Sequence, residues 1–140
     1  MKKVYFAGGC FWCICDYMLS LGLDGIKDII VGYSGGIEKD ASYELVKSQK
    51  TKHRETIEIT YDENKISLVE LLDIFSSYVD IHDKDGQYID KGYSYTLALY
   101  YQSEEEKKIY TEYVSKLTPP VYISVEEFKF FVIGEEYHQH

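Results

Sequence analysis

The chain has 140 residues, a formal net charge of −9 and three cysteines. This length predicts a single domain over residues 1–140, with one hydrophobic core. The negative charge argues against nucleic acid or an anionic membrane surface as a partner. The sequence has no apolar run long enough to span a membrane and no signal-peptide core, so we expect a cytoplasmic protein.

Hydrophobic spacing predicts alternating strands and helices along the chain. Strands are expected over residues 3–7, 28–33, 55–61, 95–101 and about 127–132, and helices over 10–21, 42–48, 67–79 and 103–117. A polar loop is expected over residues 82–92. Ser103 and Glu106 predict a capping box at the start of the last helix, and Pro119-Pro120 breaks the chain after it. These elements predict a two-layer α/β or α+β domain in which helices pack on a mixed sheet.

A cysteine-rich run, Gly9-Cys10-Phe11-Trp12-Cys13, joins the first strand to the first helix. Cys10 is therefore expected at a helix N-terminus, where unpaired N–H groups and the helix dipole favour a thiolate over a thiol. All three cysteines lie between positions 10 and 15, so bonds between them could not link distant parts of the fold. Nucleophilic or redox use in a reducing cytoplasm fits this arrangement better than a disulfide scaffold.

Other polar clusters have plain structural interpretations. The run Tyr33-Ser34-Gly35-Gly36 is typical of a tight turn. His53-Arg54-Glu55 precedes a strand, and an acidic residue at such a place is usually solvated. A metal site would have to draw on Cys10, Cys13, His53 and His138. The histidines lack ligand spacing and Cys-x-x-Cys alone is half a zinc motif, so we expect no metal and no cofactor.

Taken together and in chain order, these clusters resemble the A-type peptide methionine sulfoxide reductases. The matching motifs are Gly9-Cys10-Phe11-Trp12, Gly32-Tyr33-Ser34-Gly35-Gly36, Ser42-Tyr43, His53-Arg54-Glu55, Gln87-Tyr88 with Asp90 and Gly92, Tyr95, and Tyr137-His138-Gln139. The resemblance covers residues 6–140, and its first motif is highly specific. It implies a ferredoxin-like sheet and reduction of the S epimer of methionine sulfoxide, free or within proteins. It also implies thioredoxin as the reductant.

Reduction of a sulfoxide by a thiol needs a nucleophilic sulfur, an acid for the oxygen and a pocket for the methyl group. Cys10 supplies the sulfur. Phe11 and Trp12 would form an apolar wall that receives the methyl group of the substrate. Glu55 matches the proton donor of the family, and a largely apolar pocket would raise its pKa enough to keep it protonated near neutral pH.

The resemblance assigns four further residues to the substrate pocket. Tyr43 and Tyr95 match positions whose hydroxyls hydrogen-bond the sulfoxide oxygen. Asp90 matches a carboxylate that helps to fix the substrate, and His138 matches a histidine near the pocket rim. Thr96 stands where relatives often have arginine, so the preference between free and protein-bound substrate stays open.

Attack by Cys10 would release methionine and leave a sulfenic acid, which a second thiol must meet. Many family members use a cysteine in a C-terminal tail, but this sequence has none after Cys15. Cys13 is three residues from Cys10 and shares its helical face, so we expect a Cys10–Cys13 disulfide that thioredoxin reduces. Cys15 points away and is expected to be a small buried residue, although its use in place of Cys13 remains an alternative.

Two other functions compete with this interpretation. A thiol–disulfide oxidoreductase would use the Cys10-x-x-Cys13 pair without any need for Glu55 or the tyrosines. A non-catalytic module that binds methionine-rich or oxidised peptides would need neither thiol to react. In each case we expect a monomer.

Overall fold

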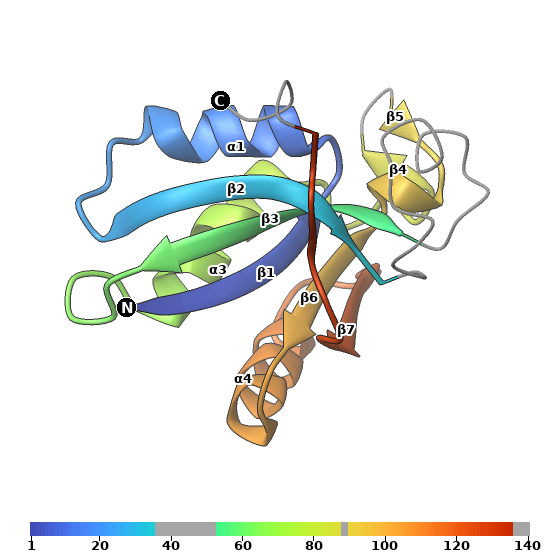
Figure 1. Cartoon of the computed structure of the whole chain (residues 1–140). Coiled ribbons are helices and arrows are strands. Elements are labelled where there is room, and N and C mark those ends of the chain that lie inside the picture. Colours follow the sequence, from blue (N-terminus) through green and yellow to red (C-terminus); the bar gives the residue numbers. More distant parts are fainter. Residues whose placement is uncertain (36–52, 88–89, 136–140) are drawn as a thin grey trace.

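A computed structural model describes residues 1–35, 53–87 and 90–135 of the chain. Its main feature is a six-stranded sheet with the spatial order β7-β6-β1-β3-β2-β8 (Figure 1). The strands are β1 (Lys2–Gly8), β2 (Ile26–Ser34), β3 (Arg54–Tyr61), β6 (Leu97–Tyr101), β7 (Ile123–Glu127) and β8 (Val132–Ile133). Neighbouring strands are antiparallel except β6 and β7, which are parallel. The sheet is therefore mixed, as the sequence predicted.

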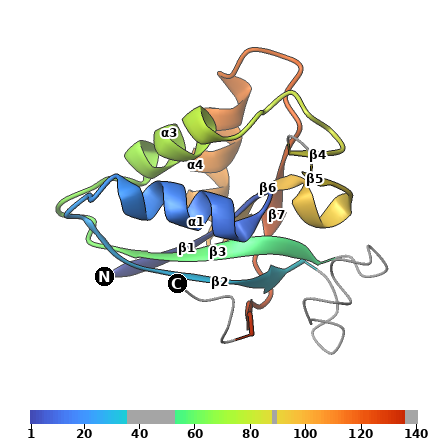
Figure 2. The ribbon, with the colours of Figure 1, turned by 90° about the horizontal axis from the view of Figure 1, so that it is seen from above.

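The core of this sheet has a ferredoxin-like arrangement. The order β1, α1 (Phe11–Ser20), β2, β3, α3 (Leu68–Tyr78), β6 along the chain becomes β6-β1-β3-β2 in space. The helices α1, α3 and α4 (Glu104–Ser115) all lie on one face of the sheet (Figure 2). The expected two-layer α/β fold is confirmed.

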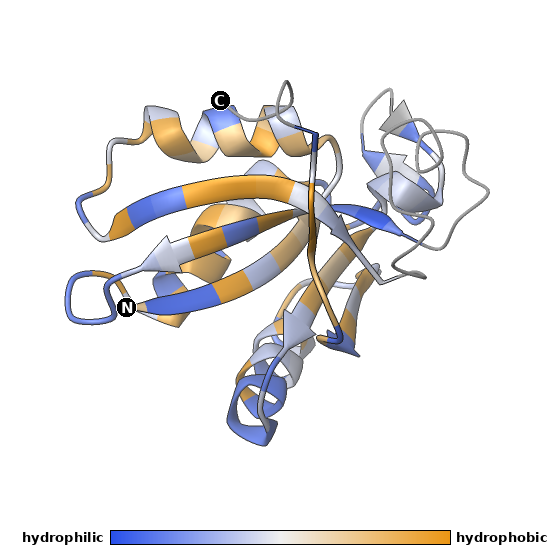
Figure 3. Ribbon diagram, viewed as in Figure 1, coloured by the Kyte–Doolittle hydropathy of each residue, from blue (hydrophilic) through white to orange (hydrophobic). Residues whose placement is uncertain are grey.

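The main hydrophobic core fills the space between the sheet and the three helices. Phe6 of β1 lies at its centre, with its ring 5.3 Å from that of Phe75 in α3 and 6.1 Å from that of Tyr110 in α4. Figure 3 shows hydrophobic residues in the middle of β2 and recurring along α1. This burial holds the start of α1 against the sheet.

The opposite face of the sheet is covered by the chain between β7 and β8, which crosses it in Figure 1. The Tyr5 ring stacks on that of Phe128 at 4.1 Å and lies 5.4 Å from that of Phe131. The single strand expected over 127–132 is therefore wrong, because the segment between Phe128 and Phe131 crosses the sheet over Tyr5 instead of continuing β7. Strand β7 ends at Glu127 and β8 begins only at Val132.

Smaller differences from the sequence prediction occur around the site. The expected loop over 82–92 contains a short hairpin, β4 (Gly86–Gln87) and β5 (Asp90–Lys91). The strand expected from residue 95 begins at Leu97, because Tyr93–Tyr95 form a 3-10 turn, η2. Ser103 caps α4 by accepting from the Glu106 N–H, but the Glu106 carboxylate accepts from Gln102, so the capping box is incomplete. The helix expected over 42–48 lies outside the described residues.

None of the helices among the described residues is long and apolar enough to cross a membrane.

The Tyr110 hydroxyl generates a stability prediction, because it is buried without a hydrogen-bond partner among the described residues. Tyr110→Phe removes this unsatisfied group, so we expect the free energy of unfolding to rise by about 1 kcal/mol. Tyr100→Phe is the matched control: its hydroxyl accepts from Arg54 at 3.2 Å, and its removal should lower stability by about 1.5–3 kcal/mol. Denaturant unfolding of both variants measures the difference. A loss of stability in Tyr110→Phe would contradict this account of the core.

Candidate active site

The site is built at the turn between β1 and α1, which only glycine allows. Gly9 has φ +86°, and a Cβ there would lie 2.8 Å from Cβ of Gln87. A Cβ on Gly8 would lie 2.5 Å from Cδ1 of Ile14. Gln87 is itself fixed by two bonds to the Asp80 backbone, of 2.7 and 2.8 Å. The chain therefore passes closely between α1 and β4 before it reaches Cys10.

Cys10 caps the N-terminus of α1, as the sequence predicted. Its carbonyl accepts the first helical bond, from the N–H of Ile14 at 3.2 Å. The thiol is half-buried and makes no capping hydrogen bond of its own. The helix start therefore fixes the backbone of Cys10, while the thiol makes no capping bond to the helix.

A buried carboxyl lies at the same helix N-terminus. Glu55 of β3 is 2 % exposed, and its Oε1 accepts from the backbone N–H of Phe11 at 3.0 Å. The first N–H groups of a helix have no acceptor within the helix, so Glu55 satisfies one of them. The alternative considered from sequence, that Glu55 is a solvated surface residue, is therefore wrong. Glu55 lies inside the protein and bonds the residue that directly follows Cys10.

The electrostatics of Cys10 differ from the sequence expectation. Burial raises the pKa of its thiol to about 12, and the Cys13 thiol and the Glu55 charge act in the same direction. The backbone N–H of Cys13 lowers the pKa but does not outweigh burial. The helix-dipole argument predicted a thiolate, and this prediction is wrong for the present structure because burial disfavours the charged form more strongly.

The other two thiols have different surroundings. Cys13 is exposed, and its thiol lies close enough to Cys10 to raise the pKa of that group. Cys15 is 2 % exposed in the hydrophobic core, where burial first and the Asp16 charge second raise its pKa to about 11. The structure therefore brings Cys10 and Cys13 together and turns Cys15 toward the core.

The two residues of the predicted apolar wall differ in exposure: Trp12 lies at the surface and Phe11 lies in the core. The Trp12 side chain is 42 % exposed and can meet a ligand. Phe11 is buried, with its ring 6.1 Å from that of Trp12 and 5.7 Å from that of Tyr33. The Tyr33 hydroxyl in turn donates to Glu135 at 3.0 Å. Phe11 thus supports Trp12 from inside.

Of the remaining predicted site residues, the structure describes Tyr95 in full and only the backbone of Asp90. Tyr95 ends the turn η2 and is half-buried, with its carbonyl oxygen 3.9 Å from the position of a Cβ on Gly9. The backbone of Asp90 pairs with Gln87 in the β4–β5 hairpin. Tyr43, His138 and the side chain of Asp90 lie outside the described part of the structure. Within that part, no three His, Cys, Asp or Glu side chains gather in a way that could hold a metal ion.

Sequence reasoning gave no role to two buried polar residues near the site, Gln87 and Arg54. A signal for Arg54 was present, since it is the only arginine of the chain and directly precedes Glu55.

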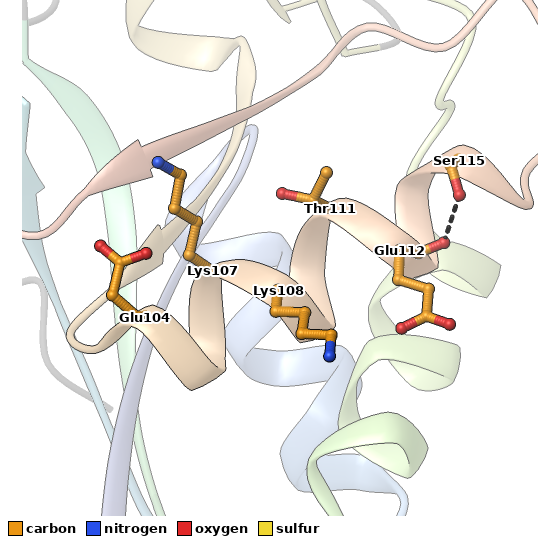
Figure 4. A pocket seen from close by; sticks show the side chains of 6 residues that line it. All are labelled: Glu104, Lys107, Lys108, Thr111, Glu112 and Ser115. Atoms are coloured by element: carbon orange, nitrogen blue, oxygen red, sulfur yellow. Dashed lines mark hydrogen bonds between the residues drawn. The ribbon is translucent and has the colours of Figure 1, made fainter.

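A surface depression also lies along α4 (Figure 4). It is lined by Glu104, Lys107, Lys108, Thr111, Glu112 and Ser115. None of these side chains is a nucleophile activated by burial, and none comes from α1 or β3. The chemistry is therefore to be sought at the start of α1.

A thiol with a second thiol one helical turn away can be oxidised and reduced repeatedly, and a buried carboxyl can supply or take up the proton. The fold and site therefore define a thiol-dependent oxidoreductase.

Comparisons with known proteins specify this class. The family model described as peptide methionine sulfoxide reductase matches residues 2–140, so the chain belongs to that family. An MsrA of Streptococcus agalactiae is 34 % identical over 99 % of this chain and 85 % of its own. MsrA 1 of Lactococcus lactis is 38 % identical, over 99 % and 78 %. Reduced Mxr1 from Saccharomyces cerevisiae is 32 % identical and superposes with a TM-score of 0.88, over 99 % and 82 %. The A-type resemblance is confirmed, and the disulfide oxidoreductase and binding-module alternatives are set aside.

Proposed function

We propose that this reductase acts on the S epimer of methionine sulfoxide, free or in proteins, by oxidising Cys10 to a sulfenic acid. One observation carries the proposal: the buried Glu55 carboxyl and the half-buried Cys10 thiol lie at the same end of α1. A nucleophile and an acid at one helix terminus match the two demands of sulfoxide reduction.

In the first step, Cys10 Sγ attacks the sulfoxide sulfur and Glu55 gives a proton to the oxygen. In this mechanism the buried Glu55 is protonated before the attack, and in that form it carries no negative charge to raise the pKa of Cys10. The Cys10 thiol gives up its proton as it attacks, and the Glu55 carboxylate takes up that proton. The sulfoxide S–O bond then breaks, and the oxygen, with the proton from Glu55, bonds to Cys10 Sγ. Methionine leaves as the thioether, and the thiol becomes a sulfenic acid.

The substrate is held by groups around this thiol. Trp12 offers an exposed apolar surface for the methyl group, and the Tyr95 hydroxyl bonds the sulfoxide oxygen. For Tyr43, Asp90 and His138 we retain the roles implied by the family resemblance.

Cys13 resolves the intermediate. Its thiol attacks the Cys10 sulfenic acid, water leaves and a Cys10–Cys13 disulfide forms, which thioredoxin reduces by thiol–disulfide exchange. Exposure of Cys13 and its closeness to Cys10 support this assignment. We further propose that the enzyme works as a monomer in the cytoplasm, where thioredoxin is kept reduced.

The proposal is tested by incubating the wild type and Cys10→Ser with racemic methyl p-tolyl sulfoxide and dithiothreitol. The wild type should form sulfide from one enantiomer only, and Cys10→Ser should form none. Sulfide from both enantiomers, or turnover without Cys10, would refute the proposed chemistry.

The role of Glu55 leads to a prediction about rate and pH. Glu55→Gln keeps an oxygen that can accept from Phe11 but loses the transferable proton, so the rate should fall by about 10²–10⁴-fold. Part of the loss should return at low pH, where solvent supplies protons. Steady-state rates across pH measure both effects, and a variant as fast as the wild type would show that Glu55 is not the acid.

The assignment of the resolving thiol gives a second prediction. Cys13→Ser should release one methionine per enzyme, because attack by Cys10 precedes resolution. It should then stall with thioredoxin while still cycling with dithiothreitol, which can reduce the sulfenic acid directly. Counting methionine in single-turnover and multiple-turnover experiments measures this difference.

Cys15→Ser is the matched control, since this thiol lies only two residues beyond Cys13 on the same helix but is buried. It should cycle with both reductants, apart from some loss of stability. A Cys10–Cys15 bond found by mass spectrometry after one turnover would assign resolution to Cys15 instead.

A further inference from the structure

Arg54 is the only arginine among the 15 lysine and arginine residues of the chain, and it is 5 % exposed. The chain thus uses lysine wherever a basic residue is needed except at this buried position. Arginine differs from lysine in its planar fork, which can hold several acceptors at fixed angles. This choice points to a geometric task beside Glu55.

The fork of Arg54 ties three strands together. Its Nη1 donates to Glu126 of β7 at 2.6 Å and to the Tyr100 hydroxyl of β6 at 3.2 Å. Its Nε donates to Oγ1 of Thr96, at the end of η2, at 2.8 Å. Glu126 neutralises the guanidinium, and Ser124 Oγ donates to the same Glu126 oxygen at 2.7 Å. The positive charge of Arg54 is therefore paired with Glu126, and its remaining bonds fix the positions of the groups around it.

The contacts of Arg54 converge on the turn η2. Its guanidinium lies 4.6 Å from the centre of the Tyr93 ring, at the start of the turn. Thr96 Oγ1, which accepts from Arg54, donates to the Tyr93 carbonyl at 2.6 Å. The turn is otherwise closed by two backbone bonds of 3.0 Å, from Tyr95 to Gly92 and from Thr96 to Tyr93. Arg54 thus holds both ends of the segment that carries Tyr95.

We propose that Arg54 is a positioning residue that fixes Tyr95 at the site through η2, an inference that rests on the role proposed above for Tyr95. The carbonyl of Tyr95 already lies against the Gly9 backbone, one residue before the nucleophile. Loss of the fork would let the turn shift and move the Tyr95 hydroxyl away from the sulfoxide oxygen. Misplacement by about 1 Å can cost on the order of 10²-fold in rate.

A double-mutant cycle tests this coupling. Arg54→Lys, Tyr95→Phe and the double variant are assayed for kcat/KM with methyl p-tolyl sulfoxide and dithiothreitol. We expect Arg54→Lys to lower kcat/KM by about 10–100-fold. The double variant should be no slower than the slower single variant, because both changes remove the same contribution. Losses that multiply, or an unchanged Arg54→Lys, would overturn the proposal.

Two further variants separate positioning from stability. Glu126→Gln weakens the ion pair but leaves the Thr96 bond and the Tyr93 stack, so it should lower the thermal midpoint while kcat/KM stays within about twofold of wild type. Thr96→Val keeps the ion pair and the Tyr93 stack but removes the Thr96 hydroxyl that joins Arg54 to the Tyr93 carbonyl. It should therefore reproduce most of the rate loss of Arg54→Lys, even if the Arg54→Lys protein folds poorly. The reverse order, with Glu126→Gln slow and Thr96→Val at wild-type rate, would assign Arg54 to stability alone. A wild type that forms no sulfide would refute the proposed function rather than this inference.

Discussion

The bond from the Phe11 N–H to the Glu55 carboxyl is the contact on which the site depends. It joins β3 of the sheet to the first turn of α1 and places the proposed acid at the helix terminus that begins at Cys10. The register of β2 and β3 supports it, because Tyr33 lies opposite Glu55 and packs its ring against Phe11. Gly8 and Gly9 complete the arrangement, since a side chain at either would push α1 away from the sheet or from Gln87.

The three thiols differ in burial, and the roles proposed for them follow that difference. Burial raises the pKa of the half-buried Cys10 thiol, so this proposed nucleophile is protonated at rest. Cys13 is exposed, which suits its proposed role of forming a disulfide that an external reductant can reach. Cys15 packs in the core. A protonated thiol at rest would also limit unwanted oxidation of the proposed nucleophile.

Much of this could be predicted from sequence, and the failures have physical reasons. Alternation places β1 and β3, and helical spacing places α1 and α3, within a residue or two of their observed bounds. The strand expected over 127–132 fails because Phe128 and Phe131 lie in the segment between β7 and β8, where their rings cover Tyr5 on the far face of the sheet. The prediction of a thiolate at Cys10 fails because it considered the helix dipole alone, whereas burial of the thiol disfavours its charged form and raises its pKa. Arg54 was missed because a polar residue before a strand is usually solvated, and only the fold reveals what surrounds it.

The central claim is that Glu55 and Cys10 lie at one helix terminus, close enough for a negative charge on Glu55 to raise the pKa of the Cys10 thiol. The most direct measurement is the pKa of Cys10, followed by the ultraviolet absorbance of its thiolate in a Cys13→Ser, Cys15→Ser background. Replacing Glu55 with glutamine removes a negative charge that raises this pKa, so the pKa should fall. An unchanged or higher pKa in the glutamine variant would contradict the account.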